Sequence, residues 1–148
     1  KAQGNGYYEI QRTKPQTIGY SLNDSPIGLA AWIAEKYYGW FDEKTNKLVV
    51  TNDEVLSIIS LYWFTESAPS SARLYKENGE FGFSFNKISQ PMAGAIFKKD
   101  IMIPPRVWAE NIYNVVQWNE YDGGHFAAME KPEVLADDII KFISNLVK

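Results

Sequence analysis

The sequence contains no cysteine and a single histidine, His125, among its 148 residues. The absence of cysteine excludes a disulfide framework and metal sites built from thiolates. With one imidazole, a zinc site made of several histidines of this chain is excluded as well. The redox compartment stays open, because a chain without cysteine fits either side of a membrane.

Strong charge and long apolar runs are also missing. The formal net charge is −3 and no lysine or arginine cluster stands out, so we do not expect a nucleic-acid or anionic-membrane surface. No apolar run reaches the length of a membrane span, and the opening KAQGNGYY is not a signal peptide. We interpret this opening, which has no methionine, as the start of a processed or excised segment or as a cloning boundary.

Apolar and aromatic residues, by contrast, are abundant. Hydrophobic residues make up 45% of the chain and aromatic residues 15%, in a mass of 16.9 kDa. This composition argues against disorder, which needs few aromatics and much net charge. The length is that of one ordinary domain and allows a buried core.

The first part of the chain is predicted to be helical. Apolar periodicity and capping signals predict three helices, over residues 22–42, 51–64 and 70–79. Asp24 or Ser25 can cap the first helix, and Gly79 is expected to stop the third. A mixture of glycine, phenylalanine and polar residues then predicts a loop over residues 79–90.

The second part has a different pattern, of short apolar runs that alternate with helices. It predicts a strand over 91–100, a short helix over 104–113, a strand over 114–122 and a long amphipathic helix over 131–148. One face of that last helix is expected to hold Val134, Leu135, Ile139, Phe142, Ile143 and Leu146. This order predicts a parallel βαβα unit.

Two parallel strands do not make a domain, because their apolar runs need helices on both faces and further strands beside them. We therefore expect an α/β fold in which residues 91–148 form the end of a larger, mostly parallel sheet. Residues 1–90 are expected to form a separate helical layer or lid.

Two titratable side chains follow the two predicted strands. Functional sites of open parallel sheets lie at the carboxyl ends of the strands, and Asp100 and His125 would both lie there on neighbouring strands. The carboxylate would accept a hydrogen bond from Nδ1 and leave Nε2 free to act as a general base. Gly123 and Gly124 would let the backbone turn sharply before the ring.

The pattern alone leaves alternatives open. A lone histidine after a strand can simply hydrogen-bond within a loop, and Asp122 competes with Asp100 for the acidic role. No G-x-S-x-G elbow exists to supply a nucleophile. Ser70 and Ser71 lie at a predicted helix start, where capping is the default explanation.

Longer motifs in the chain carry a resemblance. The stretches GYYEIQRTKPQTIGYSLNDSPIGLAAWIAEKYYGW, LYWFTESAPSSARLYKEN, AIFKKDIMIPPRVWAE and GGHFAAMEKPEVLADDIIKFI resemble the C-terminal part of epoxide hydrolases of the microsomal and juvenile-hormone type. Those enzymes are α/β-hydrolases with a helical cap. The resemblance covers nearly the whole chain, so it implies a cap segment in residues 1–90 and the last core strands in residues 91–148.

The resemblance also implies a mechanism without cofactor or metal. In that family an aspartate opens the epoxide and forms an ester, two cap tyrosines donate a proton to the epoxide oxygen, and an acid-paired histidine activates the water that cleaves the ester. By motif position the tyrosines fall on Tyr7 and Tyr75, with Tyr8 as the alternative to the first. The histidine falls on His125 and its acid on Asp100. Tyr62 and Trp63 line the substrate cavity or only the core of the cap.

One part of the family pattern is missing. The nucleophile's Gly-Asp-x-Gly turn, the first core strands and the backbone donors of the oxyanion hole do not occur in this sequence. We therefore expect a piece of a split or cleaved hydrolase whose partner is the N-terminal part that carries the nucleophile. The sequence does not decide whether the protein forms a homo-oligomer. It does not decide the localisation either, for which the resemblance implies the microsomal membrane or the cytoplasm.

Three functions compete at this stage. The first is hydrolysis of a small apolar epoxide, of the terpenoid, lipid or aromatic kind, in detoxification or lipid metabolism. The second is a non-catalytic subunit that binds an apolar ligand, which would not need the acid, the histidine and both tyrosines together. The third is a dehalogenase or esterase on the same fold, neither of which needs a tyrosine to protonate an alkoxide.

Overall fold

The computed structural model describes residues 4–42, 50–81 and 86–147, which divide into two compact units. The first unit comprises residues 4–36 and 52–81, and the second comprises residues 37–42, 50–51 and 86–147. Each unit is described by itself. The assignment of residues 1–90 to a cap and 91–148 to a core remains a prediction.

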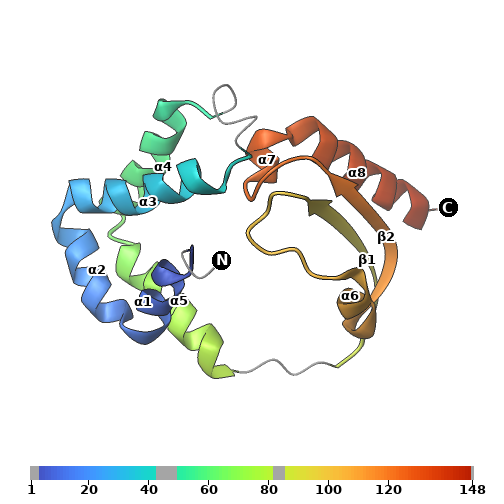
Figure 1. The fold of residues 1–148 in the computed structure, drawn as a ribbon, viewed down its shortest axis with the longest axis horizontal. Helices are drawn as coiled ribbons and strands as arrows, with labels where there is room; N and C mark the ends of the chain where they lie inside the picture. Colours follow the sequence, from blue (N-terminus) through green and yellow to red (C-terminus); the bar gives the residue numbers. More distant parts are fainter. Residues whose placement is uncertain (1–3, 43–49, 82–85, 148) are drawn as a thin grey trace. The chain divides into compact units, whose positions relative to one another are not determined.

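The first unit is helical (Figure 1). It contains α1 (Gly6–Thr13), α2 (Pro15–Asp24), most of α3 (Pro26–Trp40), α4 (Asn52–Phe64) and α5 (Ala68–Phe81). Pro15 and Pro26 each open a helix, where the fixed φ of proline suits the first turn. The Oγ of Ser25 accepts a hydrogen bond from the Gly28 N–H at 3.0 Å. Ser25 rather than Asp24 therefore caps α3.

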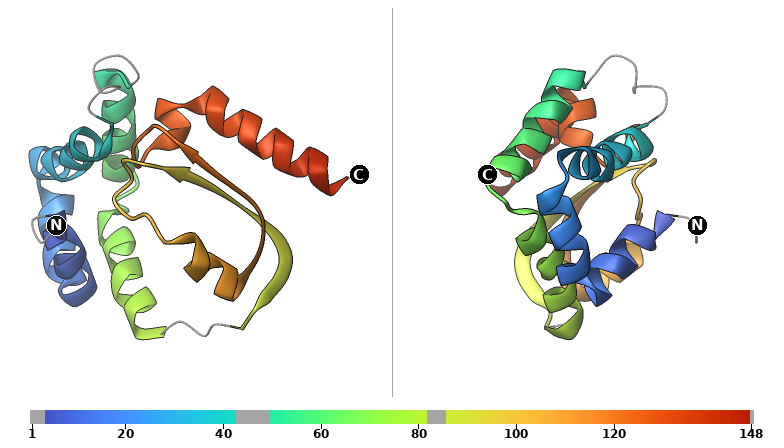
Figure 2. Two further views of the ribbon diagram at one scale, coloured as in Figure 1. Left: turned by 45° about the vertical axis from the view of Figure 1, so that its right-hand side comes forward. Right: turned by 90° about the vertical axis from the view of Figure 1, so that its left-hand side faces the viewer.

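The core of the first unit lies where these helices meet. Leu22, Leu29 and Ala68 are buried there, and Tyr62 and Trp63 pack against them. Helix α5 runs alongside α2 (Figure 2). The approach is close because a Cβ on Gly19 would lie 2.9 Å from the Cβ of Pro69. Tyr62 and Trp63 therefore contact the helical core of this unit, and their place in a substrate cavity remains a prediction.

The second unit is built on two parallel strands, β1 (Ile88–Phe97) and β2 (Tyr113–Tyr121), as predicted. Helix α6 (Arg106–Ile112) connects them, and α7 (Ala127–Glu130) and α8 (Pro132–Leu146) follow (Figure 1). The register pairs Gly94 with Trp118. A Cβ on Gly94 would lie 2.5 Å from the Trp118 ring, so the indole lies on the bare backbone of β1.

Two sequence predictions need correction. Helix α5 does not stop at Gly79 but continues to Phe81, since an isolated glycine weakens a helix by about 1 kcal/mol without ending it. Of the loop predicted over 79–90, residues 79–81 are helical and residues 88–90 belong to β1, while residues 82–85 lie outside the described ranges.

Helix α8 is amphipathic, as predicted, but it also carries a buried acid that the apolar pattern does not indicate. Ile139, Ile143 and Leu146 of its predicted apolar face are about half exposed in the described chain, whereas Asp138 is only 3% exposed. Asp138 faces β2 because the strand's side chains on that face are polar. The Asn119 amide and the Tyr121 hydroxyl each donate to Asp138 Oδ1 at 2.6 Å, and the Gln117 amide donates to the Asp138 carbonyl at 3.0 Å.

Over residues 4–42, 50–81 and 86–147, no helix has both the length and the apolar character that crossing a bilayer requires.

Candidate active site

The carboxyl ends of β1 and β2 bring together an acid and an imidazole. Asp100 follows β1 after a short turn, and His125 follows β2 after the two glycines. The distance from His125 Nδ1 to Asp100 Oδ1 is 2.6 Å, and both side chains are about one-third exposed. The parallel pairing of the strands therefore produces the contact expected from the sequence.

The hydrogen bonds around Asp100 define the roles of the two ring nitrogens. Asp100 Oδ1 also accepts the backbone N–H of Ile101 at 2.6 Å. An ionised carboxylate can only accept, so beside ionised Asp100 the Nδ1 of His125 has to be the donor. In neutral imidazole Nε2 then carries a lone pair and can take a proton from water.

Asp122 lies in a different environment. Its side chain is 86% exposed and is 3.8 Å from the Lys98 ammonium. At a solvent-exposed site, such a pair contributes little. Of the two acids that the sequence offered for the histidine, Asp100 is the one in contact with it.

The turn between β2 and His125 depends on its glycines. Gly123 has a φ of +150°, a conformation that side chains disfavour. A Cβ there would also lie 2.8 Å from the Phe97 ring. The Lys99 N–H donates to the Gly123 carbonyl at 2.9 Å, which fastens this turn to the segment that carries Asp100.

Aromatic rings surround the histidine within the second unit. The His125 ring meets Trp40 at 5.1 Å between centroids with an interplanar angle of 82°, and it meets Phe126 at 5.1 Å and 74°. Tyr37 stacks on Phe126 at 4.3 Å and 8°. The imidazole thus has an edge-on aromatic neighbour from α3 and another from the next residue of the chain.

Two residues that hold the histidine loop, Trp40 and Glu130, were not predicted from the sequence. The backbone N–H of His125 donates to the backbone carbonyl of Trp40 at 2.9 Å. The two residues are 85 positions apart in the sequence, and no local pattern reveals such a contact. Glu130 is buried and accepts hydrogen bonds from two backbone N–H groups. Its position in an otherwise apolar run, HFAAME, is the signal that could have identified it.

Tyr7 and Tyr75 lie together in the first unit. Their rings are 6.1 Å apart at 85°, and Tyr8 also meets Tyr75, at 5.8 Å and 72°. Tyr7 is half-buried, whereas Tyr8 is 39% exposed. Both tyrosines of the GYY sequence therefore touch Tyr75, but Tyr7 is the more enclosed.

The surroundings of Tyr7 favour a neutral phenol. Burial raises its pKa above the usual 10.0, and the neighbouring Tyr75 and Tyr8 add to this effect. The Lys36 ammonium lies 4.6 Å from the centre of its ring. A phenol that keeps its proton at neutral pH can donate it to a developing alkoxide.

The serines at the start of α5 are engaged locally. The Ser70 hydroxyl donates to the Ser67 carbonyl at 2.9 Å, and the Ser71 hydroxyl donates to the Ala68 carbonyl at 2.8 Å. These bonds hold them to their own helix. Within the described ranges, no three acidic or imidazole side chains gather as a metal ion would require.

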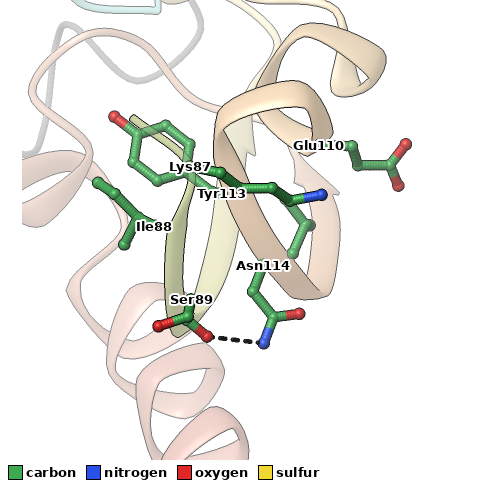
Figure 3. Close-up of a pocket in the computed structure, with 7 residues that line it drawn as sticks. Lys87, Ile88, Ser89, Glu110, Tyr113 and Asn114 are labelled. Carbon is green, nitrogen blue, oxygen red and sulfur yellow. Dashed lines mark hydrogen bonds between the residues drawn. The ribbon is translucent and has the colours of Figure 1, made fainter. Parts of the chain in front are cut away.

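A hollow of about 410 Å³ lies at the opposite end of the two strands (Figure 3). Its lining comes from the starts of β1 and β2 and from α6, and the Asn114 amide bridges the strands by donating to the Ser89 carbonyl at 3.1 Å. Because the strands are parallel, this hollow is remote from Asp100 and His125. It does not belong to the candidate active site.

Comparisons with known proteins find similarity to epoxide hydrolases. The chain is 43% identical to epoxide hydrolase 1 of Sus scrofa over an alignment 155 residues long. The alignment covers 95% of this chain and 34% of that protein. The solved epoxide hydrolase of Aspergillus niger matches with a TM-score of 0.84 and 36% identity, over 96% of this chain and 36% of that one. No family model matches the chain.

A third match is the juvenile hormone epoxide hydrolase of the silkworm Bombyx mori, with a TM-score of 0.88 and 32% identity. It covers 97% of this chain and 37% of that one. The chain thus spans about a third of the length of the relatives and structures it matches. The match is to a mixed α/β segment with two parallel strands, as the fold prediction required.

Proposed function

We propose that this chain, which is homologous to about a third of the epoxide hydrolases of the microsomal and juvenile-hormone type, contributes the general base and the proton donors of a two-step epoxide hydrolysis. The observation that carries the proposal is the 2.6 Å contact between His125 Nδ1 and Asp100 Oδ1 at the carboxyl ends of two neighbouring parallel strands. Residues outside this sequence supply the nucleophile.

The first step is the opening of the epoxide. A carboxylate oxygen attacks one ring carbon, the C–O bond to the epoxide oxygen breaks, and an ester forms. Tyr7 or Tyr75 donates a proton to the oxygen that leaves, which becomes a hydroxyl group. A positioned acid of this kind accelerates such a step by about 10²- to 10⁴-fold.

The second step is the hydrolysis of the ester. Nε2 of His125 takes a proton from water while the water oxygen attacks the ester carbonyl carbon, and Asp100 stabilises the imidazolium that forms. The carbonyl–oxygen bond of the ester then breaks, which releases the diol and restores the carboxylate. The imidazolium proton returns to the tyrosine, so the sum is epoxide plus water to vicinal diol.

The two neighbouring tyrosines favour an epoxide as the substrate over a haloalkane or a ligand that is bound without conversion. A halide leaves without a proton, and a binding subunit would need neither the acid nor the base. The contact between Tyr7 and Tyr75 is therefore the observation that argues for ring opening. The apolar terpenoid, lipid and aromatic epoxides all remain candidates, since hydrophobic ligands are the rule for apolar pockets.

The test uses the complete hydrolase that contains these residues, with the substitution His125→Gln. Three probes are used: styrene oxide, a long-chain fatty-acid epoxide and a terpenoid epoxide. We expect the covalent ester to accumulate on the variant and to be detected by mass spectrometry as one added substrate mass. The matched diols, which cannot alkylate a carboxylate, are the controls.

The outcomes separate the candidate functions. An accumulating ester supports the two-step mechanism. If the parent enzyme converts a probe but the variant accumulates no ester, the assignment of His125 to the second step is wrong. If the parent binds the probes without converting any, the non-catalytic alternative is favoured, and conversion of a haloalkane instead would favour a dehalogenase.

A further inference from the structure

A buried carboxylate supports the loop that carries the histidine. Glu130, the last residue of α7, is only 4% exposed. Its Oε2 accepts the Asp42 N–H at 2.9 Å and the Gly124 N–H at 3.0 Å. A buried carboxylate is costly unless hydrogen bonds satisfy it, and bonds from N–H groups to a charged acceptor are stronger than neutral ones.

The two backbone segments that Glu130 joins also bind each other. The Trp40 carbonyl accepts a hydrogen bond from the backbone N–H of His125 at 2.9 Å. Residues 40–42 therefore offer a carbonyl to His125 and an N–H to Glu130, while Gly124 donates to the same carboxylate oxygen. The result is a closed arrangement of three segments, with Glu130 bonded to two of them.

Gly124 shows how closely these segments approach one another. A Cβ at this position would lie 2.5 Å from the Trp40 carbonyl oxygen, 2.6 Å from the Asp42 nitrogen and 2.6 Å from Glu130 Oε1. No real Cβ tolerates such contacts with backbone atoms. The backbone one residue before the imidazole is therefore enclosed on several sides, and the carboxylate is one of the enclosing groups.

From this arrangement we propose that Glu130 is a positioning residue for His125. It fixes the backbone of residues 124 and 125, and so it sets where the imidazole meets Asp100, which a different strand carries. The inference rests on the proposed function, because it assigns Glu130 to the hydrolysis step of that mechanism.

The two chemical steps should therefore respond differently when Glu130 is replaced. Ring opening depends on the nucleophile and the tyrosines, whereas ester hydrolysis depends on the orientation of His125. A misplacement of about 1 Å can cost about 10²-fold in a step that needs alignment. Loss of Glu130 should slow hydrolysis and spare ring opening, and in steady state kcat and KM should fall together while kcat/KM is preserved.

The experiment compares Glu130→Ala and Glu130→Gln with the parent in single turnovers of the complete hydrolase with styrene oxide. We expect Glu130→Ala to hydrolyse the ester about 10- to 100-fold more slowly. Glu130→Gln keeps an acceptor oxygen but loses the charge, so its effect should be smaller. Ring-opening rates should stay within about threefold of the parent's.

Glu133→Gln is the matched control, because it removes the same charge from an exposed position in the first turn of α8. It should leave both steps unchanged. The amount of ester formed in the first turnover counts the correctly folded molecules, so all rates are normalised to it. If Glu130→Ala does not fold, Glu130→Gln decides.

Two failures are distinguishable. If the parent forms no ester at all, the proposed function is wrong and the inference falls with it. If the parent forms and hydrolyses the ester, but both Glu130 variants hydrolyse it at the parental rate or lose ring opening to the same extent, only the positioning role of Glu130 is wrong.

Discussion

The two units of this chain position their candidate functional residues by different means. In the first unit, Tyr7 and Tyr75 meet through ring contacts, over helices whose core is formed by Leu22, Leu29 and Ala68. In the second unit, a network of hydrogen bonds to carboxylates positions His125. The first arrangement depends on apolar packing, and the second depends on charged carboxylates and on the direction of the hydrogen bonds that they accept.

This difference matches what each step would need. A proton donor needs a phenol within reach of an oxygen, and two tyrosines can share that task. A general base needs one nitrogen directed at one water, because hydrogen bonds weaken steeply away from linearity. Substitutions in the second unit should therefore affect activity through orientation, and those in the first unit should have milder effects.

The largest effect is expected for Asp100→Asn in the complete hydrolase. An amide can donate to the imidazole, favour the wrong tautomer and fail to stabilise imidazolium, so ester hydrolysis should slow by about 10³- to 10⁴-fold. Ester formation should persist, and rapid-quench mass spectrometry would follow both. Asp122→Asn, at an exposed acid, is the control and should behave like the parent. Equal losses in the two variants would contradict the pairing.

An intermediate effect is expected for Tyr75→Phe. Because Tyr7 remains as a second donor, ring opening should slow by only about 10- to 100-fold, below the range of about 10²- to 10⁴-fold for a sole general acid. Hydrolysis of the ester should not change, as measured by its decay after the substrate is exhausted. Tyr20→Phe, at a residue 68% exposed, provides the matched control. An unchanged alkylation rate in Tyr75→Phe would remove Tyr75 from the site.

The smallest effect is expected for Asp138→Asn, and it concerns stability. Burial by itself would raise the pKa of Asp138, but hydrogen bonds from Tyr121 and Asn119 outweigh it and lower the pKa below its usual 3.8. The ionised form therefore stabilises the fold above that pH, and this contribution is lost as the pH falls through the lower value of the folded state.

Replacing Asp138 by asparagine should cost about 1 to 2 kcal/mol at neutral pH, which is the scale of hydrogen bonds to a charged group. The difference from the parent should shrink as the pH falls below 4. Urea unfolding of the complete protein across this range would measure it, with Asp137→Asn, at an exposed neighbour, as the control. A difference independent of pH would show that charge on Asp138 is not involved.

Topology made much of the second unit predictable. The alternation of apolar runs and helices predicts the two parallel strands, and the location of functional sites at strand ends predicts that Asp100 and His125 meet. The support from Trp40 and Glu130 was not predictable, because it joins backbone groups far apart in the sequence. The burial of Asp138 in α8 was not predictable either, because an apolar periodicity cannot reveal that this residue meets the polar face of β2.

In the first unit, local rules predicted α3, α4 and α5 but neither α1 nor most of α2, and they did not identify the functional residues. Ser25 was recognisable as a cap, yet Gly79 did not end α5, since surrounding residues favour helix strongly enough to continue it. Tyr7 and Tyr75 could be singled out among nine tyrosines only through their resemblance to longer motifs. The spacing of tyrosines in a sequence does not distinguish a proton donor from a tyrosine that only packs in the core.

The pairing of β1 with β2 alone, in the part of the chain that the structure describes, has a practical consequence for preparing this segment in isolation. One edge of β1 would offer its backbone N–H and C=O groups to any other chain, which is how sheets template aggregation. Pro91, the fourth residue of β1, has no N–H to offer, whereas residues 92–97 each have one. Protein concentration, more than temperature, should limit how long the isolated segment stays monodisperse.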